Sequence, residues 1–315
     1  MASPPYGPDG DPHSAGLGDS TLFGDSTLAL LVDEPFQILR PSVQTLPFVF
    51  ASGHSGRNYP DRLIAESRLD ALMLRRSEDA FVDELFAGVA GLGAPMIAAR
   101  FPRAYCDVNR AASELDPAMF DAALEMPVDA PTPRVAAGLG VIPRIVRDGA
   151  EIYAAKLSPR EAQLRLSRLY KPYHAALAGL AEETRKRFGV AVVVDCHSMP
   201  SALSVPDIVL GDRYGGSAPP LLTGWAENAF VGGRFSIARN APYAGGYTTM
   251  LYGRGRNGLF GLQIEINRAL YLDEDRIQRK PGFDTLKKRL LEALTRLTAI
   301  DPSLLGGHAL PLAAE

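Results

Sequence analysis

The stretch VAVVVDCHSMPS at residues 190–201 decides the fold of this chain. It begins as a run of β-branched apolar residues and then changes abruptly to Asp195, Cys196, His197 and Ser198. A short continuous apolar run of this kind is typical of a strand buried on both faces, as in the middle of a parallel sheet. Ligands of open α/β sheets bind outside the carboxyl ends of the strands. We therefore predict a functional site where this strand leaves the core, around His197.

Further predicted strands and helices alternate along the chain. Strands are expected at residues 46–51, 94–99, 207–210, 235–238 and 259–267. Helices are expected at residues 64–76, 80–90, 158–188, 218–231 and 283–300, with Pro172 breaking or kinking the third. We also expect a strand or hairpin at 28–39 and a long loop at 240–257. This order predicts an α/β fold, a single domain over residues 26–315 with a central mixed, largely parallel sheet flanked by helices.

Composition excludes several classes of protein. The 315 residues are 46% hydrophobic and 22% charged, as in an ordinary globular enzyme. The net charge is -3 without a basic run, so nucleic acid is not an expected partner. No apolar segment approaches the roughly 18 residues that cross a membrane, and the N-terminus lacks the pattern of a secretory signal. Residues 1–25, rich in Gly, Pro, Ser and Asp, are expected to form a disordered or loosely attached tail. Two cysteines favour a reducing cytoplasm over a disulfide framework.

Two histidines, His54 and His197, each follow a strand of buried type. Histidine is a common zinc ligand, and a catalytic zinc keeps about three protein ligands and an open position. The third ligand would be a carboxylate, with Asp79 as first candidate and Glu78 and Asp83 as the next. The alternative is that each histidine only makes a local hydrogen bond in a loop.

Two acidic residues lie on strands near this predicted site. Asp195 precedes His197 by two residues, which suits a carboxylate that orients a histidine, or one that caps the strand end. A triad with Ser198 as nucleophile is less consistent, because adjacent strand residues face opposite ways and no Gly-x-Ser-x-Gly turn is present. Glu265 interrupts an apolar strand and is a candidate acid–base group. Its alternative role is on a polar face turned to solvent.

An arginine-rich segment follows the predicted strand at 94–99. Arginine binds carboxylates in a planar two-point geometry, so Arg110, with Asn109 and Arg103, predicts an acidic substrate. Arg100 is expected to form only a surface ion pair. Tyr247, between glycines and threonines, is a candidate for a loop that covers substrate, or a packed loop aromatic.

Six segments together resemble the N-formylglutamate amidohydrolase family, in the right order from about residue 46 to 273. They are GHSGRNYP (53–60), SEDAFVDELF (77–86), RFPRAYCDVNR (100–110), DCHS (195–198), GGYT (245–248) and QIEINR (263–268). The resemblance implies a fold similar to the zinc carboxypeptidases and a metal-dependent amide hydrolysis that releases formate and glutamate.

The resemblance also implies roles for particular residues. His54 and His197 match the two metal-binding histidines of the wider superfamily, and Glu265 matches its catalytic glutamate. Asn109-Arg110 looks like the pair that holds a substrate carboxylate. One departure is Arg57, which stands where zinc carboxypeptidases have a glutamate ligand, so Asp79 rests on inference rather than on a motif.

The expected activity is therefore hydrolysis of N-formyl-L-glutamate with one divalent metal, zinc being the expected ion. The alternatives are a deacylase or peptidase acting on another acidic N-acyl amino acid or short peptide, and a non-catalytic protein that binds a metabolite. The sequence leaves the oligomeric state open.

Overall fold

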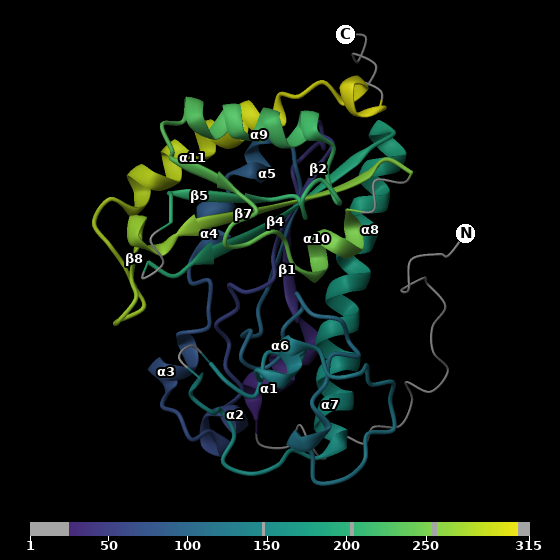
Figure 1. Ribbon diagram of the computed structural model, residues 1–315, viewed down its shortest axis with the longest axis vertical. Helices are drawn as coiled ribbons and strands as arrows, with labels where there is room; N and C mark the ends of the chain where they lie inside the picture. Colours follow the sequence, from purple (N-terminus) through teal and green to yellow (C-terminus); the bar gives the residue numbers. More distant parts are fainter. Residues whose placement is uncertain (1–24, 147–148, 202–204, 254–256, 308–315) are drawn as a thin grey trace. The chain divides into compact units, whose positions relative to one another are not determined.

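The computed structural model describes residues 25–146, 149–201, 205–253 and 257–307 (Figure 1). The predicted tail therefore lies outside the described residues, apart from Asp25. The chain forms two compact units. The first unit comprises Met1–Gln37, Gly56–Glu78 and Ala99–Ala178, and the second comprises Ile38–Ser55, Asp79–Ala98 and Gly179–Glu315.

A seven-stranded sheet organises the described part of the chain. Its strands are β1 (Phe36–Leu39), β2 (Phe48–Ser52), β3 (Met96–Ala99), β4 (Ala191–Met199), β5 (Ile208–Gly211), β6 (Ile237–Arg239) and β7 (Leu259–Asn267). The strand order is β1-β3-β2-β4-β7-β5-β6. Strand β2 pairs in parallel with β3 and β4, β4 with β7, and β5 with β6, whereas β5 and β7 are antiparallel. The predicted mixed, largely parallel sheet of an α/β fold is confirmed.

Helices cover one face of this sheet in the second unit. They are α4 (Val82–Phe86), α5 (Val89–Leu92), α9 (Pro220–Gly232) and α11 (Phe283–Thr298). Figure 1 shows α9 and α11 lying along each other over the sheet. Their apolar side chains and those of β2, β4 and β7 form one hydrophobic core. Strand β4 contributes Val192, Val194 and Cys196 to this core, so its alternate residues face the other way.

The opposite face of the sheet carries α10 (Tyr247–Tyr252), which contacts β4 and β7. The approach is close, because a Cβ on Gly261 of β7 would lie 2.7 Å from the Thr249 carbonyl oxygen. The prediction of a loop over 240–257 was therefore wrong for α10. This face carries the polar side chains of Asp195 and His197 on β4 and of Gln263 and Glu265 on β7, and they belong to the candidate site.

The first unit contains short helices and long connections. Its helices are α1 (Ser26–Asp33), α2 (Asp61–Glu66), α3 (Ala71–Arg75), α6 (Pro133–Ala136), α7 (Pro159–Arg165) and the first part of α8 (Lys171–Phe188), with a 3-10 turn at Pro117–Met119. The second unit also contains β8 (Leu272–Asp273), β9 (Gln278–Arg279) and 3-10 turns at Arg268–Leu270 and Pro302–Leu305.

Two local predictions were wrong in the first unit. Residues 28–33 are helical because the Asp25 carboxylate accepts a hydrogen bond from the Leu28 amide and caps α1, so only β1 remains of the predicted strand or hairpin. The helix expected at 64–76 is two helices, because Asp70 accepts a hydrogen bond from the Met73 amide and starts α3 anew.

The long helix predicted at 158–188 forms, with its cap at Ser158. A π-helical turn, Leu166–Tyr170, joins α7 to α8 just before Pro172. Proline removes one backbone donor and crowds the carbonyl four residues earlier, and a wider turn accommodates both effects. Pro172 therefore changes the helix locally and does not break it.

Candidate metal centre

Strand β4 places two candidate residues on the polar face of the sheet. The strand continues to Met199, so Asp195 and His197 both lie within it, and the prediction that His197 follows its end was wrong. The two residues alternate with the core-facing Val194 and Cys196, and both are buried. Nε2 of His197 lies 2.9 Å from Oδ2 of Asp195, which leaves Nδ1 directed away from that carboxylate.

His54 follows β2, the neighbour of β4 in the sheet. Its carbonyl accepts a hydrogen bond of 3.0 Å from the Asp79 amide, so one backbone contact joins two candidate residues that are 25 positions apart. The Ser55 hydroxyl accepts a bond of 3.1 Å from the Asp83 amide and holds the same turn to α4. The His54 and His197 rings lie 4.7 Å apart between centroids.

The Asp79 carboxylate reaches both histidines with one oxygen. Oδ2 lies 2.9 Å from Nδ1 of His197 and 3.4 Å from Nδ1 of His54. Oδ1 accepts hydrogen bonds from Arg268, at 2.9 Å, and from the Ser198 hydroxyl, at 3.2 Å. Burial raises the pKa of Asp79, but hydrogen bonds from the two histidines and the charges of His197 and Arg268 outweigh it and hold the pKa well below its ordinary value.

These three side chains offer a donor set for a metal ion. One ligand atom from each of His54, Asp79 and His197 lies within 4.8 Å of the others, and all three residues are buried. Two imidazole nitrogens and one carboxylate oxygen suit a catalytic zinc with an open position, in which neighbouring ligand atoms are about 3.3 Å apart. The measured spacings fit such an ion. Asp195 lies against the other nitrogen of His197.

Asp79 is the acidic residue that joins the two histidines. Glu78, the next candidate, belongs to the first unit, where Oε1 accepts hydrogen bonds from Tyr59, at 2.8 Å, and Arg75, at 2.9 Å. Asp83 lies in α4 and does not belong to the cluster of described ligand atoms.

Glu265 lies directly opposite His197 in the register of β4 and β7. Its side chain is 6% exposed, so it is not on a face turned to solvent. Burial raises the pKa of Glu265 to about 8, with the carboxylates of Asp79 and Asp195 adding to the rise and His197 opposing it. A carboxyl group with such a pKa can both accept and release a proton near neutrality.

The buried histidine carries the complementary shift. Burial lowers the pKa of His197, but the charge of Asp195 and hydrogen bonds with Asp195 and Asp79 raise it well above its ordinary value. Without any other cation at the site, a protonated His197 therefore balances part of the negative charge of these carboxylates.

The predicted carboxylate-binding residues lie in the first unit. Arg110 is 7% exposed; its Nε and Nη1 donate to the carbonyls of Leu139 and Asn109, at 2.9 and 2.8 Å. Burial lowers the pKa of Arg110. None of the described carboxylates forms an ion pair with it. A buried guanidinium of this kind is suited to an anionic ligand.

Other predicted residues are placed as follows. Arg103 forms an ion pair of 3.0 Å with Asp107, which also accepts a hydrogen bond from the Asn109 amide. Arg100 forms the expected surface ion pair, with Glu34. Tyr247 begins α10 and is half-buried.

Two residues of the site were not predicted from the sequence. Arg268 is 5% exposed and holds Asp79, and its Nε also donates to the Ser198 hydroxyl at 3.0 Å. Gln263 donates to Oε1 of Glu265 at 2.9 Å. Both belong to the segment QIEINR, and Gln263 shares the face of Glu265. The contact of Arg268 with Asp79, however, depends on the folded structure and cannot be read from that segment.

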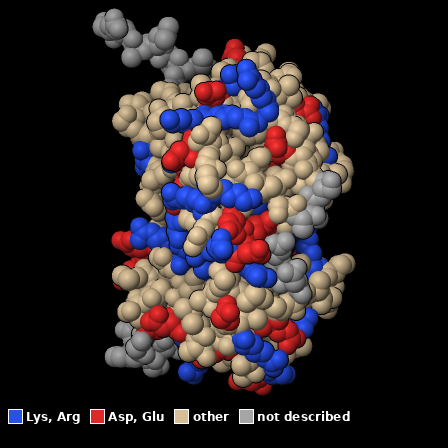
Figure 2. Space-filling view, turned by 90° about the vertical axis from the view of Figure 1, so that its left-hand side faces the viewer, with Lys and Arg blue, Asp and Glu red and all other residues tan. Residues whose placement is uncertain are grey.

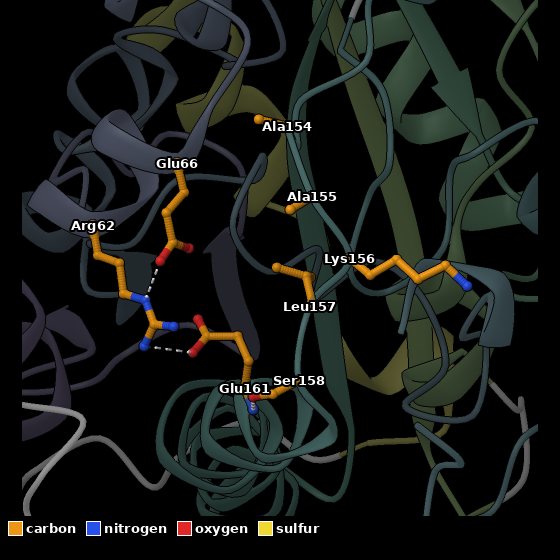
Figure 3. Close-up of a pocket in the computed structure, with 8 residues that line it drawn as sticks. All are labelled: Arg62, Glu66, Ala154, Ala155, Lys156, Leu157, Ser158 and Glu161. Carbon is orange, nitrogen blue, oxygen red and sulfur yellow. Dashed lines mark hydrogen bonds and ion pairs between the residues drawn. The ribbon is translucent and has the colours of Figure 1, made fainter. Parts of the chain in front are cut away.

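A separate hollow of about 240 Å³ lies in the first unit (Figure 3). Its charged lining includes Arg62, which pairs with Glu66 at 2.8 Å and with Glu161 at 3.6 Å. None of the predicted site residues lines it. Elsewhere, Figure 2 shows basic and acidic side chains interspersed over the visible face, and no described helix is long and apolar enough to cross a membrane.

A buried cluster of two histidines and a carboxylate, beside a glutamate with a pKa near neutrality at a sheet of α/β type, is typical of metal-dependent hydrolases. Comparison with known proteins is more specific. The chain belongs to the N-formylglutamate amidohydrolase family, whose sequence model matches residues 46–272.

Individual relatives agree with this membership. N-formylglutamate deformylase of Pseudomonas putida is 24% identical over 263 residues, which cover 79% of this chain and 92% of that protein. The enzyme of the same name from Pseudomonas aeruginosa is 27% identical over 205 residues, covering 62% and 71%. The crystal structure of N-formylglutamate amidohydrolase from Ralstonia eutropha JMP134 is 36% identical, with a TM-score of 0.78, over 84% of this chain and 96% of that one.

Proposed function

We propose that this protein hydrolyses the amide bond of N-formyl-L-glutamate and releases formate and L-glutamate. Family membership supports the substrate. The observation that carries the chemistry is the buried cluster of His54, Asp79 and His197 with Glu265 opposite His197 in the sheet. Residues 26–315 act as one metal-dependent amidohydrolase domain in this proposal.

His54, Asp79 and His197 would hold one divalent ion, with zinc as the proposed ion. When bound, such an ion lowers the pKa of water toward about 7 and polarises a carbonyl group. Asp195 keeps His197 oriented through Nε2, which lies 2.9 Å from its carboxylate.

Glu265 is the proposed acid–base group. It accepts a proton from the water whose oxygen forms the new C–O bond to the carbonyl carbon. It then donates that proton to the nitrogen of the departing amino acid as the C–N bond breaks. Burial of Glu265, which raises its pKa to about 8 in the metal-free protein, makes it a stronger base than an exposed carboxylate.

Arg110 is the proposed partner of a substrate carboxylate, with Asn109 and Arg103 beside it in sequence. Its burial without an ion pair to a described carboxylate supports this role. Tyr247 is proposed to contact the bound substrate. A cytoplasmic location is also proposed, and the two buried free cysteines are consistent with it.

Purified protein tests the proposal through metal content and formate release. We expect about one metal ion per chain and turnover of N-formylglutamate. Glu265→Gln should keep the metal and lower kcat by about 10²- to 10⁴-fold, the usual contribution of acid–base catalysis. Glu292→Gln, a matched change on the exposed side of α11, should leave both unchanged.

Other substrates separate the alternatives. Full activity of Glu265→Gln would contradict the role of Glu265. Faster turnover of another N-acyl amino acid or a short peptide would favour a different deacylase. Thermal stabilisation by N-formylglutamate without any turnover would indicate a binding protein.

A further inference from the structure

Gln263 connects Glu265 to the turn that precedes α10. It lies two residues before Glu265 on β7, on the same face, and is 3% exposed. Its side-chain Nε2 donates to Oε1 of Glu265 at 2.9 Å, and its Oε1 accepts from the Gly246 amide, also at 2.9 Å. Gly246 is the residue before Tyr247, the first residue of α10.

The orientation of the Gln263 amide follows from its partners. The Gly246 N–H can only donate, so the Gln263 oxygen must face it and the NH₂ group must face Glu265. Oε1 of Glu265 is therefore an acceptor in either protonation state. This leaves Oε2 as the oxygen that takes up and returns a proton.

We propose that Gln263 is a positioning residue for the reaction, which fixes Glu265 so that Oε2 alone exchanges protons with the substrate and water. This inference rests on the proposed function. Gln263 also couples the position of Glu265 to the turn at Gly246, because one amide group bonds both. Glu265 would otherwise rotate about its side-chain bonds and present either oxygen.

The test compares kcat with KM in Gln263→Met, which keeps the length of the side chain and loses both hydrogen bonds. We expect kcat for N-formylglutamate to fall about 10- to 100-fold, the effect of one hydrogen bond to a charged group. KM and metal content should stay within about twofold of wild type, because Gln263 contacts neither the substrate nor the metal-binding side chains in this proposal. Gln278→Met, on exposed β9, is the matched control and should retain wild-type kinetics.

A double-mutant cycle separates positioning from a merely structural role. Adding Gln263→Met to Glu265→Gln should cause no further loss of kcat, because Gln263 acts through Glu265. If Gln263→Met lowers kcat equally in wild type and in Glu265→Gln, the inference about Gln263 is wrong and the proposed function still stands. A wild-type protein without turnover overturns the proposed function and the inference together.

Amide exchange supplies a readout that does not depend on turnover. Gln263→Met should speed hydrogen exchange of the Gly246 amide by about tenfold or more. Gln263→Glu keeps an acceptor for that amide but replaces the donor that faces Glu265, so kcat should fall while Gly246 stays protected. Full kcat in Gln263→Glu, or unchanged Gly246 exchange in Gln263→Met, would contradict the arrangement.

Discussion

Binding of a divalent metal should release protons from the site. Asp79, Asp195 and Glu265 bring three carboxylates together, and Arg268 balances one of them. A divalent ion would balance the other two. Without the ion, His197 and Glu265 each keep a proton because their pKa values are raised, and these two protons balance the same charge. The metal ion and the two protons therefore compete to neutralise the same buried carboxylates.

The number of protons follows from these pKa values. With a pKa of about 8, Glu265 carries about 0.9 proton at pH 7 and about 0.1 at pH 9 in the metal-free protein. His197 must also lose its proton from Nδ1 to ligate. We expect wild-type protein to release more protons than Glu265→Gln, by up to 0.9 per ion at pH 7 and by about 0.1 at pH 9.

Isothermal titration calorimetry of metal-free protein with Zn²⁺, in buffers of different ionisation enthalpy, measures this number directly. Subtracting the value for Glu265→Gln removes the protons that come from His197 and from water. An equal release from wild type and Glu265→Gln at pH 7 would refute the raised pKa of Glu265. A difference that does not shrink between pH 7 and pH 9 would refute it as well.

Three further outcomes are expected. Arg268→Met should weaken Zn²⁺ affinity about 10- to 100-fold in a chelator competition, because Oδ1 of Asp79 loses the hydrogen bond from Arg268. Arg268→Lys should recover part of that affinity, and equal affinities of wild type and Arg268→Met would contradict this role. Tyr170→Phe removes a hydrogen bond of 2.7 Å to the Arg110 carbonyl, so steady-state kinetics should show a raised KM with little change in kcat. The Tm of metal-free protein should fall as pH rises from about 5 to 9, because the folded state raises the pKa of both Glu265 and His197 and so loses stability as each deprotonates; a rising Tm would reverse this sign.

The sequence predicted the sheet because the strands of the second unit are continuous apolar runs. Strand β4 was found from its run of β-branched residues. The errors fall where one polar residue decides the local structure. Asp25 and Asp70 cap helices that hydrophobic pattern alone does not separate from strands or from longer helices.

The candidate site was predictable in part for a similar reason. His54, His197 and Glu265 follow or interrupt apolar strands, so they stand out in the sequence. Asp79 does not, because its place depends on the backbone bond to His54. The contacts of Arg268 depend on folding across 189 positions to Asp79, which no local pattern records.

Alternation along β4 has one more consequence, for thiol chemistry. Cys196 stands between Asp195 and His197 but lies in the hydrophobic core, while Cys106 is buried in the first unit. Burial raises the pKa of both thiols, so neither is a reactive thiolate in the folded protein. Each unit thus contains one protected sulfhydryl. Their separate alkylation rates would report how often each unit opens, without any introduced label.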